Sequence, residues 1–116
     1  MQNMLESEYQ TNIKEYIMSH LFVLLVQYTA PLEDIEANLA AHRSYLQAGY
    51  DKGFLLASGP RTPREGGVII GKFANRAAAE SFSKQDPFVQ QNLARYEILE
   101  FTPVLHSTLL KSFLQS

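Results

Sequence analysis

His42 is the strongest candidate in the sequence for a residue that takes part in acid–base chemistry. The chain has three histidines, and imidazole is the side chain that ordinarily titrates near neutral pH. On a helix, His42 would fall within an apolar stripe about 60° wide. The stripe consists of Ile35, Leu39, His42 and Leu46. A polar ring at such a position needs a hydrogen-bond partner. It is either a satisfied, half-buried histidine or a general acid or base at the rim of a pocket between helix and sheet.

Asp86 directly precedes Pro87, and this order has two interpretations. Aspartate followed by proline is typical of an N-cap that opens a short helical turn. The same carboxylate could hold the tautomer of a histidine or take a proton itself. Capping does not prevent this, because a carboxylate has about four lone-pair sites. Both interpretations stay open at this point.

Residues 58–64 offer groups that could bind an oxygen or an anion. Ser58 and Gly59 end an expected strand, where a hydroxyl can form a hydrogen bond and a glycine lets the backbone approach closely. Arg61 and Arg64 follow in the loop, where together they could clamp a carboxylate or phosphate. A plain turn and a solvated loop are the alternatives, and Ser58 lacks the motif of a nucleophile elbow.

The rest of the sequence indicates neither a metal nor a cofactor. His20 and His106 flank the outer strands, and we expect both on the surface. The chain has no cysteine, so disulfides, thiolate chemistry and iron–sulfur clusters are excluded. No glycine-rich nucleotide motif, Walker loop or His-x-x-x-His pair occurs, and the spacing gives His42 no partner ligands for a metal.

Hydrophobic patterns and turn residues place these side chains on a small set of elements. We expect strand 21–28, a helix from about 32 to 51, strand 54–58, a loop over 59–66, strand 67–73, helix 76–85, a short helical turn within 88–93 and strand 96–101. This β-α-β-β-α-β order predicts an α+β fold, the ferredoxin-like split βαβ of the dimeric α/β barrel type. It has a four-stranded antiparallel sheet with two helices on one face.

Two terminal segments flank this domain, which we place at 18–104. Residues 1–17 carry an apolar side chain at every fourth position from Leu5 onward, which predicts an N-terminal helical extension. The alternatives are a disordered leader, or a misplaced start with Met18 as the true first residue. Residues 105–116 predict a C-terminal helical tail. Its apolar stripe is Leu105, Leu109, Phe113 and Leu114. Strands this apolar would expose a large patch on the face without helices, so we expect a homodimer stacked sheet to sheet.

Composition narrows the class of protein. The chain has 116 residues, of which 10 are basic and 12 acidic, with a net charge of −2. These values fit one globular domain and argue against a binder of nucleic acid or of membrane surfaces. The longest apolar run, Leu21 to Val26, has six residues, whereas a membrane span needs about 20. We therefore expect a cytoplasmic protein.

Five short motifs occur in an order that resembles a known family. They are His42-Arg-Ser-Tyr45-Leu46, Gly53-Phe-Leu-Leu-Ala-Ser58-Gly59-Pro60, Gly67-Val-Ile-Ile, Asp86-Pro87-Phe88 and Tyr96-Glu-Ile98. Together they resemble the YciI-like (YCII-related) family over about residues 21–104. The resemblance implies a ferredoxin-like fold that dimerises through its sheets, and an active site built on a His–Asp pair. His42 and Asp86 match that pair, and Ser58 and Gly59 match the strand end beside it.

The resemblance also frames the hypotheses about function. The family includes a chloromuconolactone dehalogenase, and its fold is similar to that of muconolactone isomerase. The first hypothesis is a cofactor-independent lyase or isomerase that acts on a small carboxylate or lactone. His42 would move the proton and Asp86 would orient the imidazole, while Arg61 or Arg64 would bind a carboxylate. The alternative is a non-catalytic module that binds a metabolite or docks a partner. An oxygen-using relative is a third hypothesis, because fold does not decide function.

Overall fold

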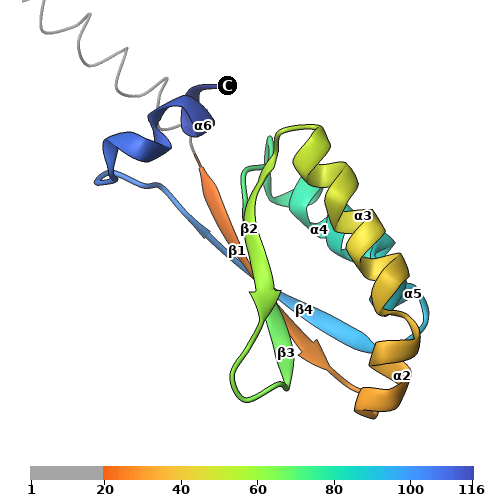
Figure 1. The fold of residues 1–116 in the computed structure, drawn as a ribbon. Helices are drawn as coiled ribbons and strands as arrows, with labels where there is room; N and C mark the ends of the chain where they lie inside the picture. Colours follow the sequence, from red (N-terminus) through yellow and green to blue (C-terminus); the bar gives the residue numbers. More distant parts are fainter. Residues whose placement is uncertain (1–19) are drawn as a thin grey trace, which may run out of the picture.

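Residues 20–116 form a four-stranded antiparallel sheet with helices packed on one of its faces (Figure 1). These are the residues that the computed structural model describes, and the extension expected over 1–17 lies outside them. The strands are β1 Leu21–Tyr28, β2 Leu55–Pro60, β3 Gly66–Gly71 and β4 Ala94–Phe101. The sheet order is β2-β3-β1-β4, and all neighbouring strands are antiparallel. The ferredoxin-like α+β fold predicted from the sequence is therefore confirmed.

The core lies between the sheet and four helices. Alternate residues of a strand point to the same face, and in β1 the residues Phe22, Leu24 and Val26 are each at most 2% exposed. The helices are α2 Leu32–Ala37, α3 Leu39–Asp51, α4 Arg76–Gln85 and α5 Pro87–Gln90. Figure 1 shows them together on one side of the sheet. Their buried apolar residues include Ile35, Leu46, Ala79, Phe82 and Phe88.

The opposite face of the sheet is apolar but only partly buried. Leu99 and Phe101 of β4 are 45% and 46% exposed. Leu99 lies opposite Val23 of β1, and Val23 lies opposite Ile70 of β3. The register therefore gathers apolar side chains from three strands into one row.

The single helix expected over 32–51 consists of two helices, α2 and α3, separated by Asn38. Asn38 has φ −111° and ψ 5°, and its side-chain amide donates to the Asp34 carbonyl oxygen at 2.9 Å. Asparagine side chains compete with helix hydrogen bonds in this way. The carbonyl of Asn38 then accepts the His42 amide at 3.1 Å. This break places His42 in the first turn of α3.

The pairing of β2 and β3 extends further toward their loop than expected, which shortens the expected loop, 59–66, to residues 61–65. β2 continues to Pro60, and β3 already begins at Gly66. A Cβ at Gly66 would lie 1.8 Å from the carbonyl oxygen of Val26 in β1. Glycine permits this close approach of two backbones, so the glycine that suggested a turn instead belongs to a strand.

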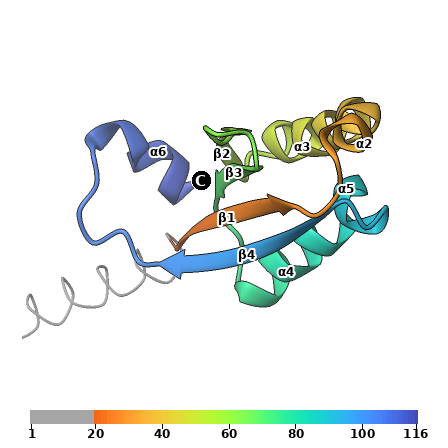
Figure 2. The same cartoon turned by 90° about the horizontal axis from the view of Figure 1, so that it is seen from below.

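The C-terminal segment differs from the helical stripe expected over its length. It contains a 3-10 helix, η1 Thr108–Leu110, followed by α6 Lys111–Gln115. The Ser107 hydroxyl accepts from the Leu109 amide at 3.2 Å and so caps η1, which leaves Leu105 outside the helical part. Leu105 and Leu109 are 91% and 88% exposed, whereas Leu114 is 2% exposed. Figure 2 shows the segment at the end of the sheet opposite to α2 and α5.

Candidate active site

His42 lies on α3 at the edge of the core. Its side chain is 12% exposed. The imidazole stacks on the ring of Phe88, with centroids 4.0 Å apart and planes 6° apart. Phe88 belongs to the core and is 1% exposed. Because close-packed core side chains keep fixed rotamers, this contact holds the imidazole in one plane.

Asp86 lies between α4 and α5 and meets His42 with a fully buried carboxylate. His42 Nδ1 is 2.9 Å from both Asp86 Oδ1 and Oδ2. Oδ1 also accepts the Phe88 amide at 2.9 Å and so caps α5. The two interpretations of Asp86 thus hold in one geometry, since it caps a helix and bonds a histidine. Two carboxylate oxygens have enough lone pairs for both.

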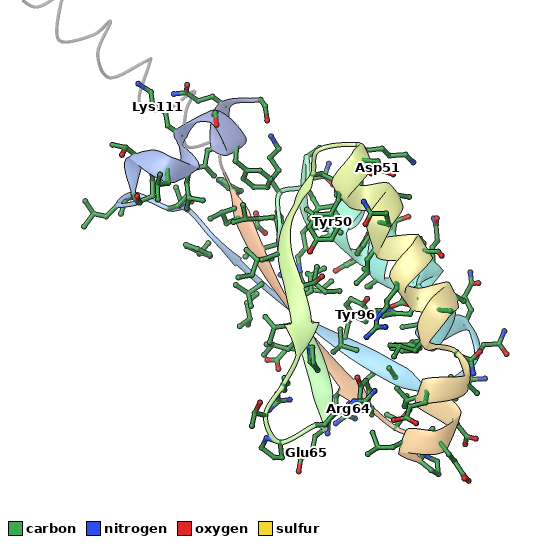
Figure 3. All side chains as sticks on the ribbon, in the orientation of Figure 1. Tyr50, Asp51, Arg64, Glu65, Tyr96 and Lys111 are labelled. Carbon is green, nitrogen blue, oxygen red and sulfur yellow. The ribbon has the colours of Figure 1, made fainter. Side chains whose placement is uncertain are left out.

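The Tyr96 hydroxyl reaches the same carboxylate from the sheet. Tyr96 lies in β4, and its hydroxyl donates to Asp86 Oδ2 at 2.5 Å. Figure 3 shows its side chain between the sheet and α3. Burial, and then the negative charge of Asp86, raise the pKa of Tyr96. The phenol is therefore protonated at neutral pH and acts as the donor.

Tyr45, one turn after His42 on α3, is a second phenol near the carboxylate. Burial, and then the charge of Asp86, raise the pKa of Tyr45 to about 12. Its hydroxyl donates to the Phe82 carbonyl oxygen at 2.6 Å and not to Asp86. The two phenols are thus similar in chemistry but differ in their acceptor.

The acceptor character of Asp86 determines which nitrogen of His42 carries a proton. An ionised carboxylate only accepts hydrogen bonds, so the neutral imidazole carries its proton on Nδ1 and its lone pair on Nε2. Within residues 20–116 no hydrogen bond reaches Nε2. Nε2 is therefore the nitrogen that can exchange a proton with a ligand.

A cavity of about 700 Å³ lies beside His42, between α3 and the β2–β3 hairpin. Its apolar lining includes Val26, Leu39, Leu46, Val68, Ile69 and Phe88. Its polar lining includes Tyr28, Glu36, His42, Arg43, Ser58 and Arg64, together with Gly59. Ligand sites in proteins typically occupy about 300–1,000 Å³ and combine apolar walls with a few polar groups. This cavity has the size and lining of a site for a small molecule.

Ser58 and Gly59 both line the cavity with His42. The Ser58 hydroxyl lies 2.6 Å from the Tyr50 hydroxyl of α3. A Cβ at Gly59 would meet nothing within 4 Å, so this stretch of backbone is open to a ligand. The structure thus brings these two residues to the same cavity as His42.

Arg61 and Arg64, which the sequence suggested as a clamp, line different hollows. Arg64 lines the cavity, and its Nη1 donates to Glu36 Oε1 at 2.8 Å, which ties the hairpin to α2 (Figure 3). Arg61 continues the pairing of the hairpin, its amide donating to the Gly66 carbonyl at 2.9 Å. Its side chain lines a separate hollow with Arg95. The two guanidinium groups do not converge on one ligand.

The sequence alone did not lead us to assign Tyr96, Arg43 and Glu36 to this site. A signal for Tyr96 was present, because the alternation of β4 places it on the core face, where a buried tyrosine hydroxyl needs a partner. Arg43 directly follows His42, is exposed and lines the cavity. Glu36 carried no local signal, since its role depends on the position of the hairpin.

The other two histidines lie outside this cavity. His20 Nδ1 is 2.8 Å from Glu100 Oε2, with the two side chains 34% and 28% exposed. His106 is exposed, and its Nδ1 lies 3.0 Å from the Ser107 carbonyl oxygen. Among residues 20–116 no three His, Cys, Asp or Glu side chains are grouped to bind a metal ion. No helix in that part of the chain has the length and hydrophobicity needed to span a membrane.

The fold and the site together define a ferredoxin-like α+β protein with a histidine–aspartate pair beside a small-molecule cavity. The family model of the YCII-related domain matches residues 20–102. The chain therefore belongs to the YCII-related family, as its motifs indicated.

A solved structure with a similar fold is 5-chloro-2-hydroxyhydroquinone dehydrochlorinase (TftG) from Burkholderia phenoliruptrix AC1100, in complex with 2,5-dihydroxybenzoquinone. The TM-score is 0.63 and the sequence identity 21%, and the match covers 77% of this chain and 97% of the other. At this identity the likeness establishes the fold alone. A comparison with curated proteins gave no match.

Proposed function

We propose that this protein is a cofactor-independent lyase or isomerase in which His42 and Asp86 form an acid–base pair. One observation carries the proposal: a fully buried carboxylate bonds a histidine that lines a ligand-sized cavity. Membership of the YCII-related family and the fold shared with a dehydrochlorinase support it. The substrate class is a small carboxylate or lactone.

The reaction begins when His42 Nε2 takes a proton from a carbon next to a carbonyl or carboxylate. The electron pair of that C–H bond forms an enolate, and the imidazole becomes an imidazolium. Return of the proton to another carbon completes an isomerisation. Departure of a leaving group with its electron pair from the neighbouring carbon completes an elimination, after which the imidazolium gives its proton to the released anion or to water. Asp86 stabilises the imidazolium between the two steps, and positioned acid–base groups of this kind contribute about 10²–10⁴-fold in rate.

Residues on the facing hairpin bind the substrate in this proposal. Ser58 and the open backbone at Gly59 position a substrate oxygen. Arg64 binds the carboxylate in exchange for Glu36, because an ion pair between exposed side chains is weak and easily replaced. Arg61, which lines another hollow, has no part in it.

A thermal-shift screen tests this function on the full chain. Wild type, His42→Ala and Asp86→Asn are melted with carboxylates, lactones, dicarbonyl compounds and 2,5-dihydroxybenzoquinone. A ligand at 100 times its Kd stabilises by about 2.7 kcal/mol and raises the Tm by several degrees. His106→Ala is the matched control, because this histidine is exposed and outside the cavity.

We expect the screen to find a compound that both wild type and His106→Ala bind and convert. Neither His42→Ala nor Asp86→Asn should convert it. A ligand that wild type binds at this cavity but leaves unchanged would overturn the catalytic role and favour a binding module. No hit, with both site variants strongly destabilised, would make His42 and Asp86 structural residues.

We also propose that the open face of the sheet binds a second copy of the chain. The support is the apolar row across β3, β1 and β4, which includes the exposed Leu99, together with the exposed Phe101 two residues further along β4. Light scattering should give the mass of a dimer for wild type and of a monomer for Leu99→Glu. Leu32→Glu is the control, because Leu32 is 44% exposed but lies on α2. A wild-type mass equal to that of one chain at micromolar concentration would refute the dimer.

A further inference from the structure

We propose that Tyr96 is a positioning residue of this site, which fixes the Asp86 carboxylate and limits its attraction for the proton of His42. The inference rests on the proposed function, because it concerns the same acid–base pair. It assigns a role to a β4 side chain that touches no substrate. Tyr96 acts through Asp86, which in turn acts through His42.

The geometry shows how Tyr96 fixes the carboxylate. Asp86 Oδ1 accepts the Phe88 amide at 2.9 Å, and Oδ2 accepts the Tyr96 hydroxyl at 2.5 Å. Each oxygen thus has one donor anchored on a secondary-structure element, α5 for the first and β4 for the second. The carboxylate cannot rotate without losing one of these bonds. His42 Nδ1 lies equally far, 2.9 Å, from both oxygens, which is the position that the two anchored donors leave for it.

The charge around Asp86 explains why this hydrogen bond matters. The carboxylate is 0% exposed, and within residues 20–116 no lysine or arginine forms an ion pair or hydrogen bond with it. A buried carboxylate with few donors favours its protonated form, and each neutral donor favours the ionised form. If Asp86 took the Nδ1 proton of the imidazolium, His42 would become a neutral and much weaker acid at Nε2. The Tyr96 hydrogen bond works against that transfer.

Tyr45 provides a matched control for this role. It is also a tyrosine near Asp86, and burial and the same carboxylate raise its pKa to about 12. Its hydroxyl, however, donates to the Phe82 carbonyl oxygen. Tyr45→Phe therefore removes a phenol hydroxyl from the same region and leaves the hydrogen bonds of Asp86 unchanged.

NMR spectroscopy of the full chain with ¹⁵N-labelled histidine tests the proposal without a substrate. The signal to follow is the Nδ1–H of His42 in wild type, Tyr96→Phe and Tyr45→Phe. Loss of the Tyr96 donor makes Asp86 a stronger acceptor, so the Nδ1 proton should move downfield. Tyr45→Phe should leave it in place.

A second variant covers the case in which Tyr96→Phe does not fold. Replacement of Tyr96 by 3-fluorotyrosine keeps the ring and the hydroxyl but makes the hydroxyl a stronger donor. The Nδ1 proton should then move upfield, opposite to its shift in Tyr96→Phe. An unchanged Nδ1 signal in a folded Tyr96 variant overturns the role of Tyr96 alone. A wild-type His42 without a proton on Nδ1 contradicts the His42–Asp86 pair and overturns both proposals.

Turnover provides a second readout once a substrate is known. Tyr96→Phe should lower kcat roughly tenfold, because hydrogen bonds to charged groups are about twice as strong as neutral ones, and it should leave KM unchanged. Tyr45→Phe should change neither constant. A rise in KM at constant kcat would place Tyr96 in substrate binding and would contradict a positioning role.

Discussion

Residues 20–116 contain two histidine–carboxylate pairs with nearly the same N···O distance and very different surroundings. His20 Nδ1 lies 2.8 Å from Glu100 Oε2, and both side chains are about one-third exposed, at 34% and 28%. His42 Nδ1 lies 2.9 Å from Asp86, where the exposed fractions are 12% and 0%. Only the second pair borders the cavity between α3 and the hairpin.

The difference lies in what surrounds each carboxylate. Glu100 lies at the end of β4, and water can take the place of its histidine. Asp86 has no access to water and depends on the donors of three elements for its negative charge. A contact distance therefore says little about function, whereas burial, additional donors and an adjacent cavity distinguish the two pairs.

The largest difference should appear in turnover. With a substrate from the ligand screen, His42→Ala should lose about 10²–10⁴-fold in kcat/KM, because it removes a positioned acid–base group. His20→Ala should retain wild-type turnover. Steady-state kinetics of the two folded variants checks this, and comparable losses in both would remove the distinction between the pairs.

Stability should separate the two carboxylates by several kcal/mol. Asp86→Ala should lower the free energy of unfolding by roughly 3 kcal/mol, because it removes a helix cap and leaves buried donors without an acceptor. Glu100→Ala should cost about 0–1 kcal/mol, as for other exposed pairs. Urea denaturation at pH 7 measures both values, and a loss below about 1 kcal/mol for Asp86→Ala would contradict a carboxylate built into the core.

Alkaline pH should affect the region of Asp86 more than that of Glu100. Burial, and then the charge of Asp86, raise the pKa of Tyr45 from its usual value of 10.0 to about 12 in the folded protein, so the folded state favours the protonated phenol. The resulting stability is fully present below pH 10 and is lost as the pH rises from 10 to 12. Since Tyr45 is only half-buried, we expect an effect below about 1 kcal/mol. Denaturation of wild type and Tyr45→Phe between pH 8 and 12 should show a shallower decline for the variant, and equal slopes would contradict this.

Salt should produce the smallest difference. At 1 M ionic strength the Debye length is about 3 Å, so the contribution of the exposed His20–Glu100 pair should vanish. The cost of Asp86→Ala should stay the same, because buried groups are screened much less. Unfolding free energies of wild type, Glu100→Ala and Asp86→Ala in low and high salt provide the measurement. A strong salt dependence for Asp86→Ala would mean that its carboxylate is accessible to ions.

The order of elements could be predicted from the sequence because strand and helix periods are local properties. The break at Asn38 could not, since it depends on the Asn38 side chain donating to the Asp34 carbonyl oxygen in a segment that otherwise has a helical pattern. Gly66 was assigned to a turn for a similar reason. Its place in a strand depends on the approach of Val26 from β1, 40 residues earlier in the sequence.

The site could be predicted in part. His42 interrupts an apolar stripe and Asp86 precedes a proline, and each could be noticed alone. That their side chains meet follows from the packing of α3 against α5, which no local pattern contains. The separation of Arg61 from Arg64 and the reach of Tyr96 to Asp86 likewise depend on how the hairpin and β4 are placed.

Asp86 both caps a helix and bonds a histidine, which affects how the sequences of other family members should be interpreted. Its Oδ1 caps α5 whether or not His42 is present, so a descendant that abandoned the reaction would still be selected to keep an aspartate there. The His42 side chain has no comparable structural role, so genetic drift could replace it with an apolar residue that stacks on Phe88. An intact aspartate is thus poor evidence that a homologue is still an enzyme. The histidine is the better diagnostic position when sequences are sorted into working and retired members.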